Sequence, residues 1–142
     1  SMPLLAPMVN VDGTVYLDGG VADSIPIERA MEIGNEKTVV VLTRNPGYRK
    51  KPTKKSVAKL YQRYYKKYPN LVKAAIDRNI VYNQELELIE KLEDEGKIFV
   101  IRPLIPTVSR LEQNPEVLMH FYMHGYRLMK RQYSALVEYL ES

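Results

Sequence analysis

Residues 16–43 read YLDGGVADSIPIERAMEIGNEKTVVVLT, and this stretch decides the fold class. Its last six residues, 38–43, are mostly β-branched and aliphatic, which predicts a strand buried on both faces, as in a parallel sheet covered by helices. Pro26 opens a predicted helix that extends to about Ile33, because the fixed φ of proline suits the first helical turn. Gly34 then ends that helix. A strand, a helix and a strand in this order predict an α/β fold.

The flanking sequence supplies the remaining predicted elements. Upstream, residues 8–17 form a predicted β-hairpin, because Asp12-Gly13 lies between β-forming residues and both turn positions favour positive φ. Downstream, the apolar spacing predicts further helices, and it leaves open whether the stretch at 83–92 continues the helix before it. The further predicted elements are a helix over about 54–68, a helix from Asn70, a helical stretch over 83–92, a strand over 97–102 and a last helix from Asn114.

Composition bounds the class of protein. The 142 residues suit one domain, and 45% hydrophobic with 27% charged residues is ordinary for a globular protein. No run of ~18 apolar residues occurs, so no membrane span is predicted. Ser1-Met2-Pro3 does not begin a signal peptide, and the expected location is the cytoplasm, with peripheral membrane association as an alternative. The absence of cysteine excludes a disulfide framework and a thiolate metal site.

Positive charge is concentrated in one part of the chain. Between Lys37 and Lys73 there are twelve Lys or Arg and no Asp or Glu, whereas the rest of the chain carries a net charge of −8. We call residues 44–73 the basic region. Such a region attracts an anionic partner, either a phospholipid surface or a nucleic acid, or it is simply a solvated helix face. The candidate lipid-binding cations are Arg49, Lys50, Lys51, Lys54, Lys55 and Lys59.

Four tyrosines lie among these lysines, at positions 61, 64, 65 and 68. Interleaved aromatic and basic residues can stack on single-stranded nucleic acid, and they also suit a helix at a phospholipid interface. The simplest interpretation places the tyrosines on a packed face and the lysines in water. We favour the packed face, keep the phospholipid surface as the alternative, and expect no nucleic-acid partner.

Asp18 is the candidate for chemistry. It ends a predicted strand, and functional groups in α/β sheets gather at the carboxyl ends of strands. Gly19 and Gly20 follow directly and let the backbone approach a neighbouring loop closely. Two other aspartates compete for the role: Asp12 belongs to the hairpin turn, and Asp23 is better placed to cap the helix that Pro26 opens.

The segment Asp-Gly-Gly-x-x-x-Ser-x-Pro at 18–26, followed by a short helix and TVVVLTR at 38–44, resembles the aspartate motif of bacterial patatin-like phospholipases. The stretch IFVIRP…VSRLEQ…Y..GY at 98–126 is similar to the tail of one branch of that family. The resemblance implies a lipid acyl hydrolase with a Ser–Asp dyad, in which the aspartate replaces the usual histidine and a glycine-rich loop binds the oxyanion. It implies that Asp18 is the dyad aspartate and that Gly19 and Gly20 support it.

The chain also departs from the family pattern. None of its six serines lies in a Gly-x-Ser-x-Gly turn, and no glycine-rich oxyanion loop occurs. In the family the serine turn and the oxyanion loop both precede the aspartate, so we expect this chain to be the C-terminal part of a patatin-like parallel-sheet hydrolase. We expect the chain to be inactive by itself and the parent protein to act on lipid esters. The expected organisation is the end of the catalytic domain at 1–48, a basic helical region at 49–96, and a strand and helix packing on the same domain at 97–142. The rival hypothesis is a non-catalytic α/β module that binds an anionic partner through the basic region.

A metal site is the remaining question. His120 and His124 lie four residues apart on the last predicted helix, with Glu116 one turn earlier, and two histidines at this spacing can bind a metal. No glutamate follows His120 directly, and no outside ligand is apparent. We therefore expect ordinary helix-face residues, with no metal and no cofactor, and the sequence leaves the oligomeric state open.

Overall fold

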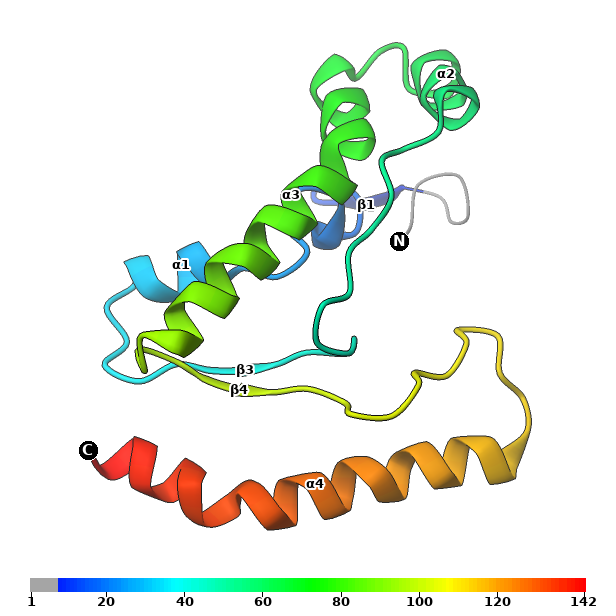
Figure 1. The fold of residues 1–142 in the computed structure, drawn as a ribbon. Helices are drawn as coiled ribbons and strands as arrows, with labels where there is room; N and C mark the ends of the chain where they lie inside the picture. Colours follow the sequence, from blue (N-terminus) through cyan, green and yellow to red (C-terminus); the bar gives the residue numbers. More distant parts are fainter. Residues whose placement is uncertain (1–7) are drawn as a thin grey trace. The chain divides into compact units, whose positions relative to one another are not determined.

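The computed structural model describes residues 8–142 and has a mixed α/β fold, as predicted (Figure 1). The chain divides into two compact units. The first comprises Ser1–Arg29 and Arg49–Leu88, and the second comprises Ala30–Tyr48 and Ile89–Ser142. Each unit contains one two-stranded sheet, antiparallel in the first and parallel in the second.

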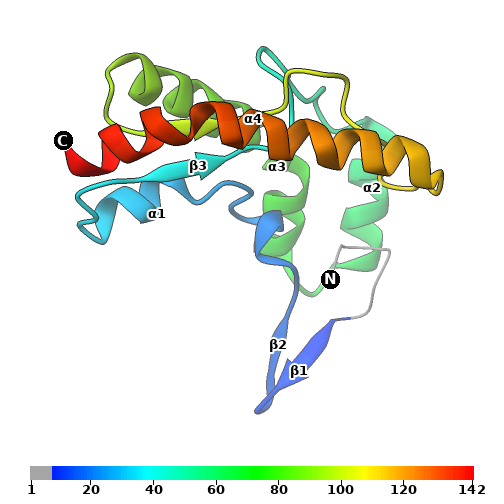
Figure 2. The same cartoon turned by 90° about the horizontal axis from the view of Figure 1, so that it is seen from below.

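The sheet of the first unit is the predicted hairpin. Strands β1 (Val9–Val11) and β2 (Thr14–Tyr16) pair antiparallel (Figure 2). Asp12 has φ 49° and Gly13 has φ 82°, the two positive angles that a tight hairpin turn requires. The Asn10 side chain closes the turn, because its Oδ1 accepts from the Gly13 N–H at 2.9 Å. The apolar side chains of both strands are exposed.

Much of the rest of the first unit is helical, and its longest helix continues past Leu88 into the second unit. The 3₁₀ helix η1 (Gly19–Val21) follows the hairpin, and α1 (Ile27–Glu32) begins in this unit. Helix α2 (Lys55–Tyr64) is shorter than predicted, whereas α3 (Pro69–Asp94) joins the predicted second and third helical stretches into one helix. The buried core of this unit consists of Val21, Ile27, Ala75, Tyr82 and Leu86.

Residues 50–53 are tied to α3 by hydrogen bonds. The Lys50 N–H donates to Asn83 Oδ1 at 2.9 Å, and Asn83 Nδ2 donates back to the Lys50 carbonyl at 3.0 Å. Asn79 Nδ2 donates to the Lys51 carbonyl at 2.8 Å, and Thr53 Oγ1 donates to the Ile76 carbonyl at 2.7 Å. These bonds satisfy a stretch of backbone that belongs to neither helix nor strand.

The second unit is built on a parallel pair of strands. Strands β3 (Val39–Val41) and β4 (Phe99–Ile101) pair with Val40 opposite Val100. Helix α4 (Pro115–Glu141) runs alongside them (Figure 1) and begins as predicted, with the Asn114 side chain accepting from the Glu116 N–H at 2.9 Å. The buried core of this unit consists of Val40, Leu42, Ile89, Leu92, Ile98, Val100 and Leu128.

The prediction that the strand at 38–43 is buried on both faces is wrong. Val40 is only 9% exposed, but Val39 is 39% and Val41 is 69% exposed. Among residues 8–142, β4 is the neighbour of β3, and the face that carries Val41 meets α4 across an open groove. The β-branched run therefore reflects strand propensity and burial of one face, not burial of both.

Candidate functional site

The Asp18 side chain is held by the turn that follows β2. Asp18 is the N-cap of η1, and its Oδ1 accepts from the Gly20 N–H at 2.9 Å. The Asp18 carbonyl accepts from the Val21 N–H at 3.0 Å, so the same residue bonds the turn through both its side chain and its backbone. This N-capping fixes the orientation of a half-buried carboxylate.

The two glycines after Asp18 differ in their surroundings. A Cβ on Gly20 would lie 3.2 Å from Asp18 Oδ1 and 3.5 Å from Arg78 Nη2, whereas a Cβ on Gly19 would meet nothing within 4 Å. A side chain at position 20 would thus press on the carboxylate that the turn orients. Close approach of the backbone explains glycine at position 20, and the described surroundings of Gly19 impose no such requirement.

Ser24 and Arg78 complete the turn. Ser24 Oγ donates to the Gly20 carbonyl at 2.8 Å, and Arg78 Nε on α3 lies 3.5 Å from the same Oγ. The guanidinium group of Arg78 therefore adds positive charge beside the Asp18 turn. Sequence reasoning did not select Arg78, because nothing local marks a residue whose partner lies 54 positions away.

A second carboxylate, Glu85, was also missed. Its Oε2 accepts from the Ile25 N–H at 3.0 Å, so Glu85 bonds the backbone ahead of α1, and capping of this helix by Asp23 stays a prediction. Asp23 lies against Glu85. Burial, and then the negative charge of Asp23, raises the pKa of the Glu85 carboxyl above its ordinary value. Asp23 and Glu85 line a pocket of about 260 Å³, and Asp18 is not among the residues that line it.

The four tyrosines between positions 61 and 68 divide into two pairs. Tyr61 and Tyr65 are half-buried, with ring centroids 6.4 Å apart. Tyr64 is 70% exposed and Tyr68 is 45% exposed. The packed-face interpretation therefore holds for Tyr61 and Tyr65. It fails for Tyr64, the last residue of α2, and for Tyr68, which follows the helix, because both are exposed to solvent.

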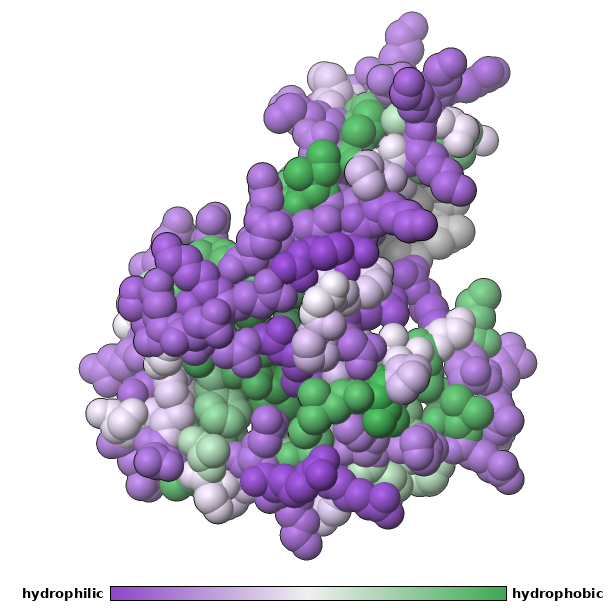
Figure 3. Space-filling view, in the orientation of Figure 1, coloured by the Kyte–Doolittle hydropathy of each residue, from purple (hydrophilic) through white to green (hydrophobic). Residues whose placement is uncertain are grey.

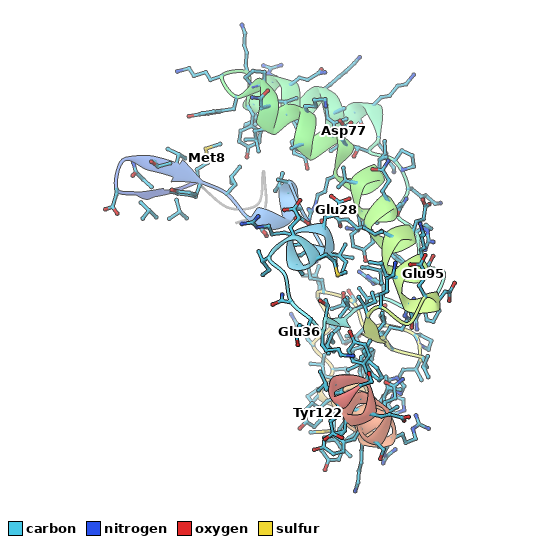
Figure 4. All side chains as sticks on the ribbon, turned by 90° about the vertical axis from the view of Figure 1, so that its left-hand side faces the viewer. Met8, Glu28, Glu36, Asp77, Glu95 and Tyr122 are labelled. Carbon is cyan, nitrogen blue, oxygen red and sulfur yellow. The ribbon has the colours of Figure 1, made fainter. Side chains whose placement is uncertain are left out.

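The cations of the basic region also differ in what they contact. Arg44 Nη1 donates to Thr107 Oγ1 at 3.0 Å, and Lys50 Nζ lies 3.4 Å from the centroid of the Tyr82 ring. Both contacts lie inside their own unit and are structural. Other lysines project into solvent, as Figure 4 shows for the long side chains around the end of the first unit near Asp77. The exposed lysines among the candidate cations are Lys51, Lys54, Lys55 and Lys59.

The two histidines of α4 have separate surroundings. His124 Nε2 accepts from the Leu104 N–H at 3.1 Å, which ties the loop after β4 to the helix, whereas His120 is exposed. Across residues 8–142, no three His, Cys, Asp or Glu side chains come together in a way that would hold a metal ion.

The described part of the chain also contains no helix whose length and apolar character would let it cross a bilayer.

The elements above define a small mixed α/β protein with a capped aspartate turn. Residues 68–141 match the family model described as Domain of unknown function (DUF6363). That match covers 74 of the 142 residues, and the chain belongs to this family. It includes α3, β4 and α4 and leaves out the Asp18 turn. No curated protein and no solved structure matches the chain.

Proposed function

We propose that this chain is the C-terminal portion of a patatin-like serine hydrolase that cleaves lipid acyl esters, with Asp18 as the dyad aspartate. The observation that carries the proposal is the hydrogen bonding of the two Asp18 carboxylate oxygens. One oxygen is fixed by the Gly20 N–H at 2.9 Å, and within residues 8–142 no donor bonds the other oxygen. A carboxylate with one fixed and one available oxygen is suited to receive a serine proton.

The chemistry assigned to Asp18 is general-base catalysis. As the serine Oγ forms a bond to the ester carbonyl carbon, its proton passes to the available Asp18 oxygen, and the carbonyl oxygen becomes an oxyanion. The proton then passes to the departing alkoxide when the ester bond breaks. Because a carboxylate is a weak base at neutral pH, its contribution depends on orientation, which the cap on η1 provides.

The nucleophile and the oxyanion loop belong to the parent protein in this proposal. The parallel pair of β3 and β4 supports it, since parallel strands occur mostly in wider sheets. So do the exposed apolar side chains of the hairpin, because an isolated two-stranded hairpin is only marginally stable in water.

Activity-based labelling tests the proposal. We expect a fluorophosphonate probe to label one serine of the full-length protein, at a position outside the six serines of this chain, and to leave the 142-residue chain unlabelled. The 142-residue chain should likewise hydrolyse a chromogenic short-chain ester no faster than buffer. Labelling of any of the six serines, or no labelling of the full-length protein, would contradict the assignment.

A second function, binding of an anionic phospholipid surface, is favoured by one observation. Exposed lysines around the start of α2 occur together with the exposed rings of Tyr64 and Tyr68. Each cation near an anionic bilayer contributes on the order of 1 kcal/mol, and aromatic rings settle at the interface. Such binding would bring a lipid hydrolase to its substrate, or it would be the whole function of a non-catalytic module.

Vesicle co-sedimentation tests this second function. Lys54→Gln/Lys59→Gln should weaken binding to anionic vesicles by about 10- to 30-fold, since two cations are lost. The matched control, Lys91→Gln/Lys97→Gln, removes the same charge from exposed positions outside the basic region and should change binding little. Added salt should weaken binding as well. Equal binding to zwitterionic vesicles, or tighter binding to single-stranded nucleic acid, would contradict a lipid-surface role.

A further inference from the structure

An apolar groove lies between the sheet and α4 in the second unit. Its volume is about 370 Å³, within the ~300–1,000 Å³ typical of ligand pockets. Gly125 on α4 leaves one wall without a side chain, and Val41 at the opposite wall is 69% exposed. Figure 3 shows hydrophobic residues exposed on this face, over β3, β4 and α4. The main apolar residues of the groove are Val41, Leu42, Ile101, Phe121, Leu128 and Met129.

A cationic pocket adjoins this groove along α4. Its volume is about 430 Å³, and Arg127, Lys130 and Arg131 line it without any acidic residue. Within residues 8–142, none of these three cations is paired with a carboxylate. Three unpaired cations around one hollow favour an anion, and a guanidinium group matches a carboxylate with two parallel hydrogen bonds.

His124 lies where the two cavities meet, because its side chain lines both. Its Nε2 accepts from the Leu104 N–H at 3.1 Å, which ties the ring to the loop after β4. The groove and the positively charged pocket therefore share His124 as a common boundary. This combination fits a molecule with one apolar chain and one anionic head.

We propose that the second unit binds a long-chain fatty-acid anion, with its tail in the groove and its carboxylate at Arg127, Lys130 and Arg131. The charge of the pocket selects an anion, and the apolar lining of the groove selects an alkyl chain. This site goes beyond the proposed hydrolase function: its residues are separate from Asp18, and binding is measured without any ester substrate. Failure of the one proposal therefore leaves the other intact.

Titration calorimetry of the 142-residue chain with fatty-acid anions tests the site. Dodecanoate should bind, and affinity should rise by roughly 3- to 4-fold for each methylene from octanoate to dodecanoate, as burial of CH₂ groups requires. Dodecanol has the same chain without the charge and should bind at least 10-fold more weakly. No binding of dodecanoate, no dependence on chain length, or equal binding of dodecanol would overturn the proposal.

Substitutions at Gly125 locate the tail. A Cβ on Gly125 meets nothing within 4 Å, so the position accepts a side chain at its root, and leucine is a better helix former than glycine. We expect Gly125→Leu to weaken dodecanoate binding at least 10-fold, whereas Gly125→Ala, the matched control, adds one methyl group and stays within about 3-fold of the unmodified chain. Equal binding by Gly125→Leu would overturn the assignment.

Charge substitutions locate the head. Arg127→Gln/Arg131→Gln should weaken dodecanoate at least 10-fold and leave dodecanol unchanged, because only the anion uses these side chains. Sedimentation velocity identifies the competing occupant, a second copy of this chain. A dimer of the unmodified chain that Gly125→Leu dissociates would show that the groove is a protein interface and would overturn the fatty-acid site.

Discussion

The Tyr139 hydroxyl joins the end of α4 to the starts of both strands in the second unit. It accepts from the Thr38 N–H at 3.0 Å, and it lies 3.2 Å from the Thr38 carbonyl and 3.0 Å from the Lys97 carbonyl. Tyr139→Phe removes these bonds and keeps the ring, whose centroid is 5.8 Å from that of Phe99. The Thr38 carbonyl retains the Phe99 N–H at 3.0 Å. The groups that lose the hydroxyl are the part-buried Thr38 N–H and the exposed Lys97 carbonyl, and only the N–H is shielded from water.

The expected cost follows from that unpartnered donor. Leaving a buried donor without a partner costs ~1–3 kcal/mol, and because Tyr139 is only half-buried we expect about 1–2 kcal/mol. At a slope of ~2 kcal/mol per M of urea, the unfolding midpoint falls by ~0.5–1 M with the slope unchanged. Tyr133→Phe on the same helix is the control, since Tyr133 is 62% exposed and should change stability by less than ~0.5 kcal/mol. Equal midpoints for the two variants would refute the structural role of the hydroxyl.

Two further predictions concern partly buried polar side chains. Burial and the charge of Asp23 raise the pKa of the Glu85 carboxyl above its ordinary value of 4.5. The native state therefore binds the carboxyl proton more tightly than the unfolded state does, and the protein loses stability as the pH rises through the native pKa. Glu85→Gln keeps an acceptor for the Ile25 N–H and should stabilise the chain at pH 7, with the gain disappearing below about pH 4.5 in urea unfolding; a gain that is the same at pH 4 and pH 7 would contradict this. Gln132 Oε1 is buried without a hydrogen-bond partner among the described residues. Gln132→Met should therefore raise the free energy of unfolding by about 1 kcal/mol. A lower free energy of unfolding in this variant would show that the amide oxygen is satisfied.

Local sequence patterns predicted the local structure well. Asp12-Gly13 gave the hairpin because its turn needs two positive φ angles, and both are present. Asn114-Pro115 gave the start of α4 because capping involves only neighbouring residues. Asp18 follows the end of β2, but β2 belongs to the antiparallel hairpin and not to the parallel sheet, and the sequence did not show that the Asp18 side chain caps the turn that follows.

Long-range packing accounts for what the sequence did not predict. Glu85 reaches Ile25 across 60 positions, and Arg78 reaches Ser24 across 54, and no periodicity marks either pair. The burial of Val41 was overestimated for a related reason. A β-branched run shows strand propensity, but the number of neighbouring strands and the fit of α4 against the sheet decide which faces are covered.

The hydrolytic rate of the full-length protein with Asp18→Asn tests the central claim most directly. Asparagine keeps the Oδ1 acceptor for the Gly20 N–H, so the turn should persist while the base is lost. We expect kcat for a chromogenic short-chain ester to fall by about 10²–10⁴-fold, the usual contribution of a general base, and Asp23→Asn, the matched control, to change it less than 10-fold. Turnover of the Asp18→Asn protein near that of the unmodified protein would contradict the assignment of Asp18 as the dyad aspartate.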